Sequence, residues 1–63
     1  MDEKLEQCLT DSLVLCDRLL VSLNKNREDA YSFFAGELYR AYDAATDQAE
    51  QKVRKIKNRI KNL

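Results

Sequence analysis

Apolar residues recur every three or four positions along two stretches of the chain, and a polar segment separates the stretches. Both series fit one face of an amphipathic α-helix. The first consists of Leu5, Cys8, Leu9, Cys16, Leu19, Leu20 and Leu23, and the second of Tyr31, Phe34, Leu38, Tyr42, Ala45, Ala49, Val53, Ile56, Ile60 and Leu63. The pattern predicts one helix over about 3–24 and a second over about 27–62.

The polar segment from Asn24 to Asp29 is the predicted turn, over about 24–28. Asparagine tolerates left-handed backbone and caps helices well, so Asn26 is expected to cap the second helix. Asp2 is expected to cap the first. Gly36 then falls inside the second helix, where we expect it to permit a close approach between helices at a cost of ~1 kcal/mol.

Two amphipathic helices joined by a short link fold as an antiparallel hairpin. The sequence therefore predicts an all-α, coiled-coil-like antiparallel two-helix hairpin, with facing residues whose numbers sum to about 54. In that register the second helix is the longer one, and residues 54–63 project by ~15 Å. An alternative is a bend in the second helix between Gly36 and Asp47, which would give three helices and shelter the segment from Val53 to Leu63.

The projecting end carries apolar residues with nothing from their own chain to cover them. A partner's helix or a second copy is expected to cover these four, namely Val53, Ile56, Ile60 and Leu63. A second surplus, Val14, Val21, Phe33 and Tyr39, points away from the predicted seam. These residues predict either a self-association or partner surface, or surface hydrophobes of the scattered kind that is normal in proteins.

Composition and charge narrow the class of protein. Sixty-three residues form at most one domain, 1–63, and eleven acidic residues balance eleven basic ones. The balance is uneven, because residues 1–30 and 31–50 each carry a net charge of −3 and residues 51–63 carry +6. The six cations there are Lys52, Arg54, Lys55, Lys57, Arg59 and Lys61. They are interpreted as the solvated flank of a coiled-coil seam, as a nucleic-acid-binding segment or as a membrane-surface helix.

Residues for catalysis are scarce. The chain has no histidine, no Gly-rich phosphate loop and no paired CxxC motif, so we expect a protein that is not an enzyme and that uses no cofactor and no metal. Cys8 and Cys16 lie too far apart on one helix to form a disulfide with each other. They are interpreted as small buried residues in a reducing cytosol, or as a reactive or intermolecular thiol. No signal peptide and no membrane span are predicted, which favours a cytoplasmic location.

Two short segments resemble known families of small helical hairpins. Ala35-Gly36-Glu37-Leu38-Tyr39-Arg40 resembles a stretch in the second helix of the plasmid copy-number regulator Rop, and this resemblance implies a dimeric hairpin that binds paired RNA loops. The opening Lys4-Leu5-Glu6-Gln7 resembles the hairpin co-chaperones of type III secretion, which hold needle subunits in the cytosol.

The sequence thus predicts a non-enzymatic interaction module, such as an adaptor, a co-chaperone or an assembly factor. It would bind a helical segment of another protein, itself as a homo-oligomer, or both, through its second helix. The alternative is a Rop-like dimeric regulator that binds RNA or another nucleic acid with the basic C-terminal segment.

Overall fold

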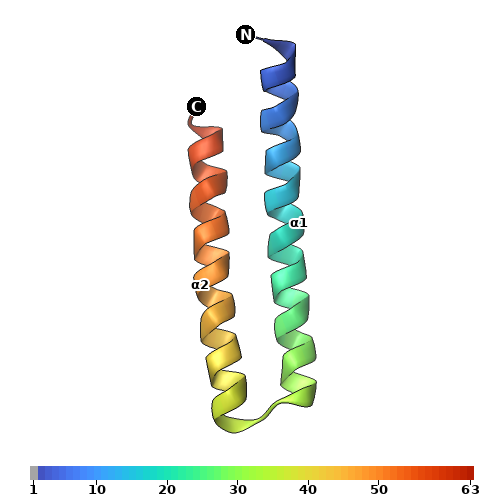
Figure 1. Ribbon diagram of the computed structural model, residues 1–63, viewed down its shortest axis with the longest axis vertical. Coiled ribbons are helices and arrows are strands. Elements are labelled where there is room, and N and C mark those ends of the chain that lie inside the picture. The colour runs from blue at the N-terminus through green and yellow to red at the C-terminus, as the bar shows by residue number, and fades with distance from the viewer. Residues whose placement is uncertain (1) are drawn as a thin grey trace.

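The computed structural model describes residues 2–63 and contains two helices, α1 (Glu3–Phe33) and α2 (Gly36–Lys61), which lie antiparallel and side by side (Figure 1). No strand occurs in these residues. The hairpin is a narrow rod with extents of 51 × 16 × 10 Å. The predicted all-α antiparallel hairpin is confirmed, and α2 is continuous, which excludes the alternative with a bend between Gly36 and Asp47.

The turn lies at Phe34 and Ala35, so the prediction of a turn over 24–28 was wrong. The polar segment belongs to α1 because its side chains are exposed to solvent while the backbone keeps its helical hydrogen bonds. Arg27 is the exception, since it is half-buried and faces α2. Asn26 is therefore not a helix cap. Asp2 caps the start of α1, as predicted, and its Oδ1 accepts a hydrogen bond of 3.0 Å from the Lys4 backbone N–H.

Glycine and aromatic residues define the observed turn. Gly36 has a φ of +63°, and no other residue among positions 2–63 has a positive φ. A Cβ atom at Gly36 would meet nothing within 4 Å, so backbone conformation rather than lack of space favours glycine here. Gly36 begins α2 and does not lie within it, contrary to the prediction. Two aromatic pairs close this end, Tyr31 with Tyr39 and Phe34 with Tyr42, at centroid distances of 5.2 and 6.2 Å.

The later turn changes the register and reverses the expected difference in length. The ion pairs Asp17–Lys57 and Arg27–Asp47 join residues whose numbers sum to 74. With 31 residues against 26, α1 is the longer helix, so the predicted projection of the second helix was wrong. About two turns at the start of α1 extend past the end of α2 instead (Figure 1). Val53 and Ile60 are half-buried against α1.

The seam between the helices buries few side chains completely. Among residues 2–63 only Cys16 and Ala30 of α1 and Thr46 of α2 are buried. The Thr46 hydroxyl donates a hydrogen bond of 2.8 Å to the Tyr42 carbonyl. Cys8 lies in the projecting turns of α1 and is exposed, which corrects the expectation that both cysteines are buried. Two helices alone leave most of their apolar surface in solvent.

Candidate protein-interaction face

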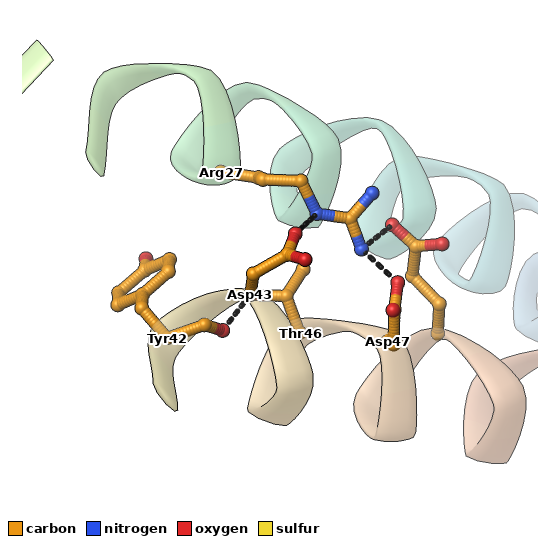
Figure 2. Close-up of polar contacts among 6 residues, drawn as sticks. Arg27, Tyr42, Asp43, Thr46 and Asp47 are labelled. Atoms are coloured by element: carbon orange, nitrogen blue, oxygen red, sulfur yellow. Dashed lines mark hydrogen bonds and ion pairs between the residues drawn. The ribbon is translucent and has the colours of Figure 1, made fainter. Parts of the chain in front are cut away.

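Ion pairs bridge the two helices along one side of the seam. Asp17 of α1 pairs with Lys57 of α2. Farther toward the turn, Arg27 of α1 contacts Asp43, Asp47 and Glu50 of α2, and Figure 2 shows its guanidinium among these carboxylates. These contacts lie at successive levels of the hairpin and define what we call the ion-pair side.

Arg27 occupies a seam position that the heptad pattern would give to an apolar residue. It continues the spacing of Cys16, Leu20 and Leu23 toward Ala30, and its side chain is only 22% exposed. Its Nε lies 2.9 Å from Asp43 Oδ1, an ionic contact whose N–H is not aligned well enough to count as a hydrogen bond. One cation meets three carboxylates, which leaves this cluster with two surplus negative charges.

The opposite side of the seam carries exposed apolar residues from both helices. Consecutive residues of a helix point about 100° apart, so the neighbours of a seam residue lie on its two sides. On α1, buried Cys16 stands between Leu15 and the ion-paired Asp17. On α2, Ile56 precedes the ion-paired Lys57. Because Asp17 and Lys57 meet on the ion-pair side, Leu15 and Ile56 lie on the other side.

The same relation places further apolar residues on this side, together with polar ones such as Ser22, Lys52 and Arg59. Cys8, Leu19, Leu38 and Ala45 each directly precede a half-buried or buried residue of the seam, and each is exposed. We call this surface the apolar face; it consists of Cys8, Leu15, Leu19, Leu38, Ala45 and Ile56. Its centre is a cluster of three large residues, because the register places Ile56 level with the segment between Leu15 and Leu19. These three are 53%, 57% and 51% exposed.

The hairpin exposes more surface than a typical folded monomer of the same mass. Its accessible surface is 5309 Å² for 7.4 kDa, whereas a folded monomer of that mass exposes ~4,200 Å². Its radius of gyration is 15.0 Å, against ~11 Å for a globular chain of this length. The excess of ~1,100 Å² is of the size that one partner contributes to a stable protein–protein interface.

The structure distributes the predicted partner-binding residues over five places. Ile56 lies on the apolar face, whereas Val53 and Ile60 lie in the seam. Val14 and Val21 are exposed on α1, where they line a shallow hollow with Asp17, Arg18 and Ser22. Phe33 and Leu63 are each 82% exposed, at the turn and after the last helical turn.

Leu15 was missing from the predicted set, and Leu19 was placed in the seam. A signal for both was present in the sequence, because an apolar residue directly before a seam residue widens the apolar arc to one side. Cys8-Leu9, Leu15-Cys16 and Leu19-Leu20 all show this doubling. The wrong register concealed the fact that the arcs of both helices open toward the same side.

The basic segment is mostly free of ion pairs within the part of the chain that the structure describes. Of its six cations, only Lys57 pairs with a carboxylate. The remaining five are Lys52, Arg54, Lys55, Arg59 and Lys61, and all are exposed. Arg54 also lines a second shallow hollow, on the ion-pair side, with Leu20, Val21, Asn24 and Glu50.

Residues 2–63 contain no group of three or more cysteine or carboxylate side chains placed to hold a metal ion. Neither α1 nor α2 has the length and apolar character needed to cross a membrane. Comparisons with protein-family models, with curated proteins and with solved structures found no match to this chain.

Proposed function

We propose that this protein is a non-enzymatic protein-interaction module, of the adaptor, co-chaperone or assembly-factor kind, that binds helical segments through its apolar face. The observation that supports the proposal is the separation of the two sides of the hairpin. Ion pairs occupy one side, and large exposed apolar residues from both helices gather on the other. An exposed apolar surface of this kind is typical of a binding site for another amphipathic helix.

The proposed contact differs from the sequence-based expectation in its location. Residues of α1 contribute as much as α2 does, because Leu15 and Leu19 flank Ile56. A partner helix lying along the seam between α1 and α2 would contact all three side chains at once and complete their burial. The two free thiols fit a reducing compartment, and on that ground we propose that the protein acts in the cytoplasm.

Capture of partners by matched variants tests this function. The double variant Leu19→Lys/Ile56→Lys places two charges in the apolar face. The control Thr10→Lys/Gln51→Lys adds the same two charges at exposed positions away from that face. A partner captured by tagged wild-type protein, identified and then titrated in purified form, should bind the control as tightly as the wild type. It should bind the face variant at least about tenfold more weakly. Equal binding by the two variants would contradict the proposal.

A second candidate function, nucleic-acid binding, is favoured by the five exposed cations that lack an ion pair. If they contact phosphates, the affinity for a short RNA duplex should fall steeply as salt is added. Lys55→Gln/Arg59→Gln should then reduce the slope of log K against log salt concentration by about two. Absence of binding to RNA and DNA at low salt would exclude this function.

A further inference from the structure

The apolar face of a lone hairpin is too wide for the chain to bury by itself. The helices contact each other through the sides that carry Arg27, Glu50 and Lys57. In this arrangement Leu15, Leu19 and Ile56 stay about half exposed. We infer that the occupant of this face is a second copy of the same chain, so that two hairpins form a four-helix bundle. The inference rests on the proposed function, because it names the partner of that same face.

The exposed area matches what a symmetric dimer requires. A second copy would cover ~800 Å² on each hairpin in an interface of ordinary size, and the excess surface of each hairpin is ~1,100 Å². A two-fold interface uses the same patch on both copies. The central cluster satisfies this condition, because Leu15, Leu19 and Ile56 are all apolar and lie at one level of the hairpin.

The charge distribution along the helices complements itself in a second copy. When two hairpins meet face to face about a two-fold axis, each helix runs antiparallel to the helix across from it. About an axis parallel to the helices, α2 of each copy lies across from α1 of the other, and the register places the basic segment 51–63, with a net charge of +6, level with residues 11–23 of the other copy. Residues 11–23 carry a net charge of −1. This arrangement brings opposite charges together, and because the chain has no net charge, no overall repulsion opposes association.

The ion-pair side is poorly suited to this role. Its carboxylates and cations are already paired across the seam of one hairpin, and covering Asp17 or Asp47 would remove charges from water without supplying new partners. The hollow beside Val14 and Val21 lies on α1 alone, so it can receive only a narrow contact.

Sedimentation equilibrium of the full chain at increasing concentrations tests the inference. The wild type and Thr10→Lys/Gln51→Lys should have the mass of a dimer, with a common dissociation constant. In Leu19→Lys/Ile56→Lys the dimer dissociation constant should rise at least about a hundredfold, because each substitution occurs twice in the interface. If the face variant stays dimeric, or if the control variant separates the copies, the inference is wrong.

Because unfolding of the face variant would also abolish the dimer, melting of the wild type supplies an independent measurement. A dimer should melt at a temperature that rises with protein concentration, whereas a folded monomer melts at the same temperature throughout. A helical wild-type chain that is monomeric at every concentration would overturn the inference. The proposed function would still stand if Leu19 and Ile56 remained necessary for binding another protein, and it would fail separately if they did not.

Discussion

Removal of Arg27 is the most direct test of how the two helices are held together. Arg27 is the only cation in contact with Asp43, Asp47 and Glu50 among the described residues, and it is only 22% exposed. In Arg27→Met the side chain keeps much of its volume and loses its charge. Three carboxylates then remain close together with no cation between them.

The magnitude follows from the number of pairs and from their exposure. Partly exposed ion pairs contribute ~0.2–1 kcal/mol each, and Asp43 and Asp47 are 41% and 57% exposed, so water screens them considerably. Glu50 is the most buried partner, at 19%. The three contacts together give an expected loss of about 1–2 kcal/mol in the free energy of unfolding, with methionine packing in the seam offsetting part of the loss.

Urea unfolding followed by circular dichroism, at one fixed protein concentration, measures this loss. Because salt screens both the attraction in the wild type and the carboxylate repulsion in the variant, the difference should shrink between ~20 mM and ~500 mM salt. The free energy of unfolding of Arg27→Lys should lie between those of the wild type and Arg27→Met. Lysine keeps the positive charge, but its ammonium group lacks the planar fork with which arginine contacts several carboxylates. A methionine variant as stable as the wild type at low salt would refute this account of the seam.

Three further predictions concern the ends of the helices and the thiols. Gly36→Ala should lower the free energy of unfolding by about 1–2 kcal/mol, and Gly36→Asn by less, because asparagine tolerates the left-handed backbone found there; urea titration of both variants checks the order. Asp2→Ala should cost about 1 kcal/mol and speed amide hydrogen exchange in the first turn of α1, while leaving the rest of that helix unchanged. In a timed reaction with a thiol reagent, exposed Cys8 should react before buried Cys16, and Cys16 reacting first would contradict the observed seam.

The existence of two antiparallel helices was predictable from the sequence, but the position of the turn was not. Periodic apolar residues identify a helical face whatever the connection, so both helices and the Asp2 cap were found. The polar segment around Asn26 has the polarity of a turn, but no residue in it has the backbone freedom of glycine, and it continues α1. Gly36, the one glycine in the chain, was the stronger signal, since it can adopt the positive φ observed there without strain.

The candidate interaction face was predictable only in part, because it depends on register. Ile56 was identified from its apolar character alone. Leu15 could be recognised only once Cys16 was known to face α2. Arg27 lies in the polar segment predicted as the turn, but its side chain faces α2. The three carboxylates that stabilise it at a seam position lie on the other helix, 16 to 23 residues later in the chain.

The position of these charges also indicates how the two helices are rotated toward each other. Ion pairs between Arg27 and the α2 carboxylates, and between Lys57 and Asp17, draw the two helices together along their charged edges. A seam centred on the apolar arcs would bury Leu15, Leu19 and Ile56 but would separate these pairs. The hairpin therefore keeps its polar contacts within one chain and leaves these three large apolar residues available to others. If so, replacing both Arg27 and Lys57 with leucine should rotate the helices toward a more apolar seam and lower the exposure of Leu19. Such a variant should associate less strongly than the wild type, even though its composition is more hydrophobic.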